Sequence, residues 1–430
     1  YRSCSTCPSN TPFVCSDTGK TVSNGQDATI VGDITDSFHA EQEDILHIAV
    51  IGAGPAGLYF SYLVKRRQPD IDITVFEQNP ADATFGFGVV FSDRALDFLR
   101  GDDPATYDLV TPAMESWRDL QLDIEGTVIR IDGIGFSAIG RLELLQLLQD
   151  QARAVGVDLV FEQRLESLQD IGTCDLIVAA DGANSIIRDC GNDLFGTTLT
   201  AMTNKFVWYG TDKPYETLTQ TFRRNADGVF NAHHYRYSPD MSTFLVEANA
   251  DSWESAGFAG MTEAETQAYC AELFADTLDG HGLISNKSLW RNYQKVENRR
   301  WSAKLPEGPM VLMGDALRTA HFSIGSGTRL AMEDAIALDR ALSGNERDIP
   351  AALIDYERSR RPIVGKLASA AHSSALWYEA FGQHMTLAPM DMAWSYIQRS
   401  GRIDEDRLAR ISPAFVERYR RHRSGRSDIG

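Results

Sequence analysis

Three glycines and one acidic residue are the first residues of this chain whose spacing points to chemistry. Gly52, Gly54 and Gly57 form a GxGxxG pattern, and Glu77 follows about 20 residues later. The first glycine permits a tight turn, the second lets backbone approach a pyrophosphate, and the third lets a helix pack close to a strand. An acidic side chain at this distance can bind a ribose hydroxyl. The pattern predicts a dinucleotide site, and its alternative is a glycine-rich packing turn.

The segments around these glycines predict the elements that position them. Residues 48–51 form an apolar run typical of a buried parallel strand, residues 58–67 an amphipathic helix, and residues 71–76 a second strand. The helix N-terminus would offer free N–H groups to phosphates. The stretch is apolar enough that a membrane-spanning helix must be considered, but His47, Pro55 and the basic end of the segment argue against it.

Length, charge and cysteine usage narrow the class of protein. With 430 residues, we expect two connected domains. The net charge of −19 makes nucleic acid a poor partner, because phosphate binding needs a basic face. The six cysteines are scattered, which favours free thiols in a reducing compartment such as the cytoplasm. Neither a signal-peptide pattern nor a clear spanning segment is apparent, so we expect no membrane association.

The first 44 residues are polar and lack periodicity, which predicts an irregular extension. Cys4, Cys7 and Cys15 suggest a zinc site, but four ligands are normally required and only His39 lies near enough in sequence to complete it. An extension with incidental cysteines, without a metal, is the favoured interpretation.

Further along, the pattern changes twice. Residues 202–250 contain segments rich in aromatic and β-branched residues, separated by turn residues, which predicts an antiparallel sheet and a second domain. Residues 351–423 are mostly helical in pattern. The eight arginines between 402 and 426 are interpreted as a solvated helical face.

Three further motifs resemble those of class A flavoprotein monooxygenases with the p-hydroxybenzoate hydroxylase-like fold. Asp175–Arg188, with Asp181-Gly182 inside it, resembles the internal Asp-Gly motif of that family. Gly314-Asp315-Ala316, followed by Gly325-Ser-Gly327, resembles the second flavin motif, and Arg141-x-x-Leu144-x-x-x-Leu148 resembles a helix whose arginine contacts the cofactor.

The resemblance implies an α/β fold, with a Rossmann-like FAD-binding domain interleaved with an antiparallel-sheet substrate domain and followed by C-terminal helices. The implied boundaries are residues 1–44 for the extension, 45–200 and 301–345 for the two parts of the FAD-binding domain, 201–300 for the substrate domain, and 346–430 for the C-terminal helices.

The resemblance also implies which residues bind FAD. The ADP half would lie on the glycine turn, the ribose on the end of the second strand, and the flavin beside the second motif, while Asp181 would brace the fold and the approach of the nicotinamide cofactor. The implied cofactor residues are Gly52, Gly54, Pro55, Ala56, Gly57, Glu77, Gln78, Arg141, Asp181, Gly314, Asp315, Gly325, Ser326, Gly327 and Thr328.

No second GxGxxG occurs, so NADH or NADPH would dock transiently. The resemblance implies that reduced flavin reacts with O2 to a C4a-hydroperoxide that hydroxylates an aromatic ring. His321 is the candidate catalytic residue, as a polar contact at that face, although it could equally pack beneath its loop. His233 and His234 are adjacent on one strand, so at most one of them faces the site.

A narrower resemblance concerns the substrate. Residues 84–93, 242–247 and 321–328 resemble the branch that contains salicylyl-CoA 5-hydroxylase and 2-aminobenzoyl-CoA monooxygenase. It implies an aromatic acyl-CoA substrate, with the ring against Phe85 and Phe87 and near His233. Cations of the predicted sheet would bind the CoA phosphates: Arg223 and Arg236, with Lys205, Lys213 and Arg224. One departure is Leu317-Arg318, where the family commonly has Ala-His.

Two other functions stay open at this point. The chain could hydroxylate a free aromatic acid or a tryptophan-like compound on the same fold, or it could be a non-catalytic binding protein that has lost FAD. The intact Gly-Asp and Asp-Gly motifs argue against the second. A homodimer is possible on the sequence alone.

Overall fold

A six-stranded sheet carries the predicted glycine turn. The computed structural model describes residues 45–92, 96–345 and 348–427, so the cysteines and histidine of the zinc alternative lie outside the described residues. The strand order is β15-β16-β9-β1-β2-β8, and all neighbours are parallel except β15 and β16. The strands span Ser302–Leu305, Gly308–Leu312, Leu176–Ala179, His47–Ile51, Asp72–Phe76 and Asp158–Val160, in that order.

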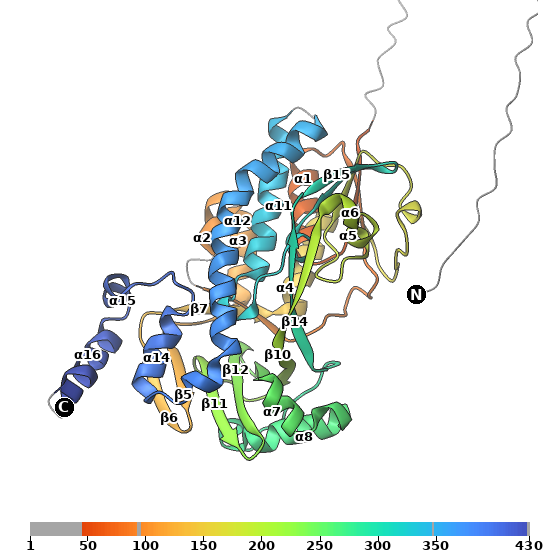
Figure 1. Cartoon of the computed structure of the whole chain (residues 1–430). Helices are drawn as coiled ribbons and strands as arrows, with labels where there is room; N and C mark the ends of the chain where they lie inside the picture. The colour runs from red at the N-terminus through yellow and green to blue at the C-terminus, as the bar shows by residue number, and fades with distance from the viewer. Residues whose placement is uncertain (1–44, 93–95, 346–347, 428–430) are drawn as a thin grey trace, which may run out of the picture. The chain divides into compact units, whose positions relative to one another are not determined.

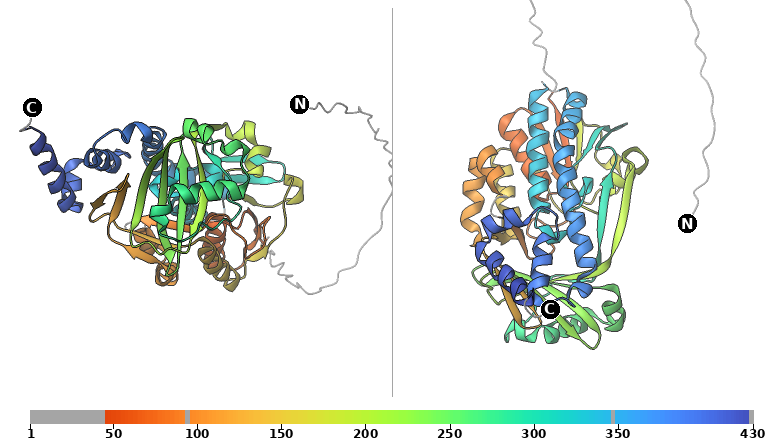
Figure 2. Two further views of the ribbon diagram at one scale, coloured as in Figure 1. Left: turned by 90° about the horizontal axis from the view of Figure 1, so that it is seen from below. Right: turned by 60° about the vertical axis from the view of Figure 1, so that its left-hand side comes forward.

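Helices cover this sheet, because their apolar faces and the apolar faces of the strands are buried from water only when they pack against each other. Helix α1 (Pro55–Arg67) packs against α4 (Arg141–Ala154) and α11 (Gly327–Gly344), and α11 packs against the long α12 (Ile349–Glu379). Figures 1 and 2 show α11 and α12 side by side. Val50 in β1, Val178 in β9 and Leu58 in α1 are fully buried in this core. The core fixes the positions of the strand ends, where the glycine turn lies.

The second large sheet has seven strands, in the order β14-β10-β13-β12-β11-β5-β6. The strands span Arg291–Asn298, Thr197–Thr211, Met241–Ala248, Gly228–Ser238, Leu218–Asn225, Leu120–Ile124 and Thr127–Ile131. One face packs on α7 (Ala250–Ser255), α8 (Glu263–Leu273) and α9 (Ala275–Leu278), with η4 at Phe258–Gly260. Toward the β5–β6 edge, the other face packs on the end of α12 and on α14 (Pro389–Gln398).

This sheet differs from the sequence-based expectation in one respect. The hairpin β5–β6 lies within the predicted first part of the FAD-binding domain, yet β5 pairs with β11, and this pair is parallel. The remaining neighbours are antiparallel. Leu120, Leu122 and Ile124 alternate along β5 and are buried against β11 and the C-terminal helices. Burial of that apolar face explains why the hairpin joins the larger sheet.

Smaller elements complete the described chain. A three-stranded antiparallel sheet has the order β3-β7-β4, spanning Gly88–Ser92, Phe136–Gly140 and Glu115–Trp117. The remaining helices are α2 (Asp97–Asp102), α3 (Pro104–Val110), η2 (Thr111–Ala113), η3 (Leu168–Asp170), α5 (Ile186–Cys190), α6 (Asn192–Phe195), α10 (Gly314–Leu317), η5 (Phe322–Ile324), α13 (Phe381–His384), α15 (Glu405–Ile411) and α16 (Pro413–Ser427). Among all described helices, none is long and apolar enough to cross a membrane.

Candidate active site

The turn between β1 and α1 contains two glycines that close backbone contacts require and a third at which a side chain would meet only open space. Gly52 has a φ of +104°, and a Cβ there would lie 2.5 Å from the carbonyl oxygen of Ala180. A Cβ at Gly57 would lie 2.1 Å from the carbonyl oxygen of Gly52. Around Gly54, by contrast, the described chain leaves at least 4 Å of open space at the Cβ position. A ligand can therefore approach the backbone at Gly54.

Helix α1 begins at this open position. Gly54 is its N-cap, no side chain caps the first turn, and Pro55 and Ala56 are its first residues. The N–H groups of the first turn are therefore available to an anion, and the helix dipole favours negative charge there.

Glu77 is held beside the turn by two backbone amides. Its Oε2 accepts from the amide of Ala53 at 3.0 Å, and its Oε1 accepts from the amide of Asn79 at 2.9 Å. Oε1 also accepts from the side-chain amide of Asn79 at 2.6 Å, whereas Oε2 has a further lone pair with which Glu77 can accept from a ribose hydroxyl. Gln78 is exposed next to it.

The second predicted motif meets the first in space. Gly314 has a φ of +59°, and a Cβ there would lie 3.1 Å from the Cβ of Ala56, so the two motifs adjoin although they are far apart in sequence. Gly325 is also left-handed, with a φ of +56°. Helix α11 then starts at Gly327 and Thr328, and its N-cap Ser326 makes no side-chain cap. A second uncapped helix start thus faces the same region.

Buried polar groups near these turns lack protein partners. The Nε of Arg141 and the Oδ1 of Asp181 are buried without a hydrogen-bond partner among the described residues. Burial lowers the pKa of Arg141, an effect that the charge of Asp315 partly offsets. Burial likewise raises the pKa of Asp315, and Arg141 and Arg318 oppose that rise. Unsatisfied polar groups beside Gly52 and Asp315 fit a polar dinucleotide cofactor.

Arg318, the departure from the family pattern, is part of a buried ion-pair network. Its Nη1 and Nη2 lie 2.8 Å and 3.0 Å from the carboxylate oxygens of Asp334, and the Nε of Arg360 lies 2.9 Å from the same carboxylate. Leu317 is buried in the core of the first sheet. The chain after Gly314-Asp315 is therefore held by core packing and by Asp334, without the usual Ala-His.

His321 lies in the loop between α10 and α11, in an aromatic setting. It is 5% exposed, its ring stacks on Phe322 at a centroid distance of 4.2 Å, and Tyr293 contacts it edge-on at 4.7 Å. Its Nδ1 accepts from the backbone amide of Ser323 at 3.4 Å and lies 2.8 Å from the Ser323 hydroxyl. Burial lowers the pKa of His321 to about 4, so the ring is neutral near pH 7. Because Nδ1 is an acceptor, the ring proton lies on Nε2, and His321 is a hydrogen-bond donor.

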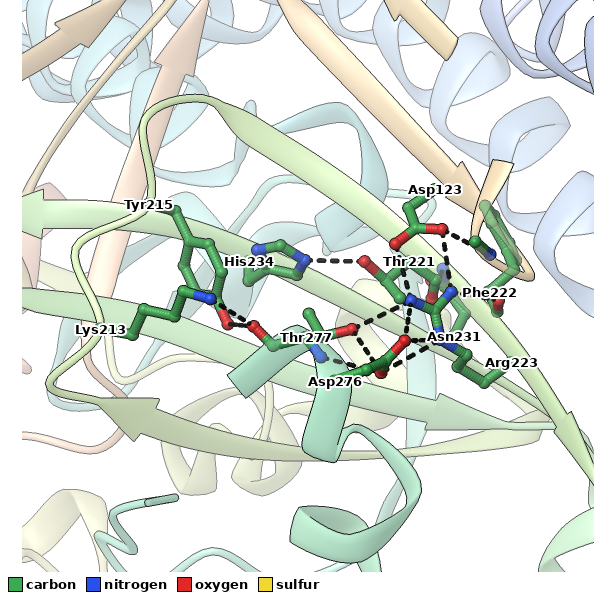
Figure 3. Close-up of polar contacts among 11 residues, drawn as sticks. Asp123, Lys213, Tyr215, Thr221, Phe222, Arg223, Asn231, His234, Asp276 and Thr277 are labelled. Atoms are coloured by element: carbon green, nitrogen blue, oxygen red, sulfur yellow. Dashed lines mark hydrogen bonds and ion pairs between the residues drawn. The ribbon is translucent and has the colours of Figure 1, made fainter. Parts of the chain in front are cut away.

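His233 and His234 point to opposite faces of the sheet, as strand alternation predicts. His233 contacts Phe322 edge-on at 5.4 Å and stacks on Tyr378 at 5.0 Å, so the structure brings it together with His321. His234 instead lies 2.8 Å from the hydroxyl of Thr221, on the face covered by α9 (Figure 3).

Glu247 is a site residue to which the sequence analysis gave no role. Its Oε2 lies 3.3 Å from the Nε2 of His233, and its Oε1 accepts from the side-chain amide of Asn204 at 2.8 Å. Burial raises the pKa of Glu247 to about 7 and lowers that of His233 to about 3. Near pH 7 the pair is therefore a hydrogen bond between a neutral histidine and a carboxyl group that is still partly protonated. A lone acid closing the apolar run Phe244–Glu247 was the available signal.

Arg399 is a second residue that the sequence did not reveal. It follows α14, donates from Nη2 to the carbonyl oxygen of Ser323 at 2.9 Å, and stacks on Tyr396 at 3.9 Å. Its charge lowers the pKa of both His233 and His321. Within the described part of the chain, no carboxylate pairs with it.

The two phenylalanines predicted to contact a substrate ring have different surroundings. The ring of Phe87 lies against Gly210, where a Cβ would be 2.5 Å from it, and Arg141 donates its amide to the Phe87 carbonyl at 2.7 Å. Phe85 is 47% exposed, with Lys287 over its ring at 5.6 Å. Phe87 is thus tied to the start of α4, while Phe85 lies at the surface.

The predicted phosphate contacts of Arg223 and Arg236 stay a prediction, and both side chains already form ion pairs within the fold. Arg223 is bound by Asp123 at 2.7 Å and by Asp276 at 2.9 Å, on the helix-covered face of the sheet opposite His233 (Figure 3). The Nε of Arg236 lies 2.7 Å from the carboxylate of Glu115. Partners that neutralise these guanidinium groups leave them poorly placed to bind CoA.

Comparison with known proteins agrees with the geometry. Residues 46–371 match the family described as "FAD binding domain". The chain is 40% identical over 395 residues to a salicyloyl-CoA 5-hydroxylase of a Streptomyces species, covering 88% of this chain and 75% of the relative. It is 38% identical over 333 residues to the 3-hydroxy-4-methyl-anthranilyl-[aryl-carrier protein] 5-monooxygenase of Streptosporangium sibiricum, covering 77% and 89%.

A solved structure of 2-methyl-3-hydroxypyridine-5-carboxylic acid oxygenase has a TM-score of 0.61 at 18% identity, covering 86% of this chain and 96% of that one. At that identity the similarity concerns the fold alone. The α/β architecture predicted from the motifs is confirmed.

Proposed function

We propose a function for this chain from one established premise: it belongs to the FAD-binding family of aromatic monooxygenases. It is a FAD-dependent hydroxylase that consumes NAD(P)H and O2. Its proposed substrate is an aromatic acyl-CoA thioester, such as salicylyl-CoA or 2-aminobenzoyl-CoA. The observation that carries this substrate class is the 40% identity with a relative named for a CoA thioester.

The proposed cofactor site follows the two glycine motifs. The pyrophosphate would meet the N–H groups at the start of α1, next to the open position at Gly54, and Glu77 would accept from the ribose. Asp315 and Arg141 would contact the ribityl chain and flavin, and the start of α11 would donate to the pyrimidine edge. When bound, FAD supplies the redox chemistry, taking a hydride from NAD(P)H and activating O2.

His321 is proposed to orient the substrate as a donor. A neutral histidine with the proton on Nε2 can donate to a ring hydroxyl or a thioester carbonyl, and its low pKa makes it a weak base. Stacking on Phe322 and the bond from Ser323 fix the ring plane, so the donor direction is set before substrate binds.

His233 and Glu247 are proposed to supply polar groups beside the His321 loop. The two groups satisfy each other, and Asn204 satisfies the remaining carboxyl oxygen. Because His233 carries no charge, it attracts little water toward the reacting atoms, and water exclusion suppresses loss of activated oxygen. The homodimer and the cytoplasmic location stay predictions.

A free aromatic acid is the second candidate substrate, and Arg399 favours it. This arginine lies beside the His321 loop without an acidic partner in the described chain, and a guanidinium binds a carboxylate well. A thioester, in contrast, has no carboxylate for Arg399 to bind.

The test is to measure kcat/KM for NAD(P)H oxidation and for product formation with salicylate, 2-aminobenzoate and their CoA thioesters. We expect the thioesters to be favoured at least about tenfold, and one atom of labelled O2 to enter the product. Equal efficiency with the free acids would reject the thioester assignment. Label arriving from water would reject monooxygenation.

A further inference from the structure

Each of the predicted sheet cations already has a partner within the fold. Besides Arg223 and Arg236, Arg224 lies 3.5 Å from Glu125 and Lys213 lies 3.7 Å from Asp279. Lys205 donates to the side chain of Asn292 at 2.8 Å and lies over the ring of Trp253. A substrate with several phosphates therefore needs cations elsewhere, and in a chain of net charge −19 such cations must be locally concentrated.

Three arginines gather where the C-terminal helices meet the start of α11, and we call them the arginine rim: Arg329, Arg402 and Arg407. Arg407 donates from Nη1 to the carbonyl oxygen of Arg402 at 3.3 Å. Partial burial and the positive charges of Arg329 and Arg407 lower the pKa of Arg402, so each of these two charges repels that of Arg402. Arg329 is paired with Glu333 at 2.7 Å.

The other two members of the rim have no acidic partner among the residues that the structure describes. Neither Arg402 nor Arg407 forms an ion pair there, and both are exposed. Two other C-terminal arginines are neutralised, since Arg420 pairs with Glu405 and Arg421 with Glu417. Arg402 and Arg407 lie close together without an ion-pair partner of their own, so a bound anion would reduce the repulsion between them.

The rim adjoins the candidate active site and has space beside it. Arg329 lies in the first turn of α11, directly after Gly327 and Thr328. Arg399, three residues before Arg402, donates to the carbonyl of Ser323 next to His321. Arg329 also lines an open cleft of about 630 Å³ between α2, α11 and α12, whose walls include Phe98 and Ile363. A long ligand could thus reach from the His321 loop to the rim.

We propose that the arginine rim binds the phosphates of the CoA moiety while the aromatic ring lies near His321. This inference rests on the proposed acyl-CoA function and deepens it. CoA carries a pyrophosphate and a 3′-phosphate, which match a cluster of guanidinium groups, and the pantetheine arm separates these phosphates from the thioester. The cleft beside Arg329 accommodates the adenosine.

The test compares ligands that differ only in the phosphates. Binding to the FAD-loaded protein is measured for benzoyl-CoA, S-benzoyl-pantetheine and benzoate, at low and at moderate salt. The variant is the double substitution Arg402→Gln with Arg407→Gln. The matched control is Arg421→Gln, which also removes surface charge but lies in the Glu417 pair on α16.

We expect the parent to bind benzoyl-CoA at least about tenfold more tightly than S-benzoyl-pantetheine, with a preference that salt weakens. The double variant should lose most of that preference, leaving S-benzoyl-pantetheine binding and the control unchanged. A parent that binds both thioesters equally has no phosphate site, which overturns the inference but leaves thioester hydroxylation standing.

Two further results would also overturn the inference that the arginine rim binds the CoA phosphates. If the parent prefers benzoyl-CoA and the double variant keeps that preference, the phosphates bind elsewhere. If the double variant instead raises only the KM for NAD(P)H, the rim serves the nicotinamide cofactor. A parent that binds neither thioester better than benzoate rejects the proposed function together with the inference.

Discussion

Arg318 and Asp334 form a buried, bidentate ion pair, with nitrogen–oxygen distances of 2.8 Å and 3.0 Å. The carboxylate of Asp334 is fully buried and also accepts from Arg360 and from the amide of Gly314 at 3.3 Å. One acidic side chain on α11 therefore links the Gly-Asp turn to α12. This linkage accounts for an arginine where the family commonly has histidine.

Replacing Asp334 by Asn should be strongly destabilising, because Arg318 and Arg360 would remain buried with a neutral partner. Breaking a buried pair in this way typically costs about 3–5 kcal/mol. Urea unfolding of the parent and of Asp334→Asn measures the difference. The matched control is Asp355→Asn, which removes the surface partner of Arg358 and should cost less than about 1 kcal/mol. Similar losses in both variants would contradict this prediction.

Gly54→Val and Gly57→Val should separate cofactor binding from folding. The position of a Cβ at Gly54 is open in the protein, and its φ of −77° is accessible to valine, so Gly54→Val should fold but lose FAD. Gly57→Val would clash with the carbonyl of Gly52 and should fail to fold. Flavin absorbance of the purified proteins and their circular dichroism distinguish the two. Full FAD occupancy in Gly54→Val would reject the proposed pyrophosphate position.

Glu247 should make stability depend on pH in a defined direction. Its pKa is about 7 in the fold against 4.5 for an ordinary glutamate, so its contribution is fully present below pH 4.5 and is lost as the pH rises through 7. Glu247→Gln lacks this loss. Its free energy of unfolding, relative to the parent, should therefore increase between pH 5 and pH 8 by up to about 3 kcal/mol.

Denaturant unfolding at several pH values measures this difference. His233 and His321 act in the opposite sense, because their lowered pKa values of about 3 and about 4 withdraw stability as the pH falls below 6.5. Both variants share these histidines, so the comparison isolates Glu247. A pH-independent difference would show that Glu247 is ionised in the fold.

Local patterns predicted the parts of the fold that depend on neighbouring residues. The glycine turn is required locally, since Gly52 needs a positive φ and Gly57 needs close contact with the turn. Strand alternation likewise placed His233 and His234 on opposite faces. Such features follow from backbone geometry within a few residues, so the local residue pattern is enough to predict them.

The ion pairs could not be predicted in this way. Arg223 finds Asp123 from the β5–β6 hairpin, whose parallel pairing with β11 no local pattern indicated. Arg399 reaches the Ser323 carbonyl only because α14 returns toward the His321 loop. Whether an arginine is free to bind phosphate depends on such distant partners, which no local pattern indicates.

His321→Phe should uncouple the reaction while leaving the fold and FAD binding intact. Phenylalanine can keep the contacts with Phe322 and Tyr293, but it lacks the Nε2 donor that we assign to substrate orientation. We expect NAD(P)H oxidation to continue while product formed per NAD(P)H falls at least about tenfold, a loss in the range of one hydrogen bond to a reacting group. Because the pKa of His321 is about 4, the coupling of the parent should show no histidine titration between pH 5 and pH 8. The control is His281→Phe, an exposed position after α9 whose ring lies 3.0 Å from Asp212, which should remain coupled. Full coupling in His321→Phe would show that this ring only packs beneath its loop.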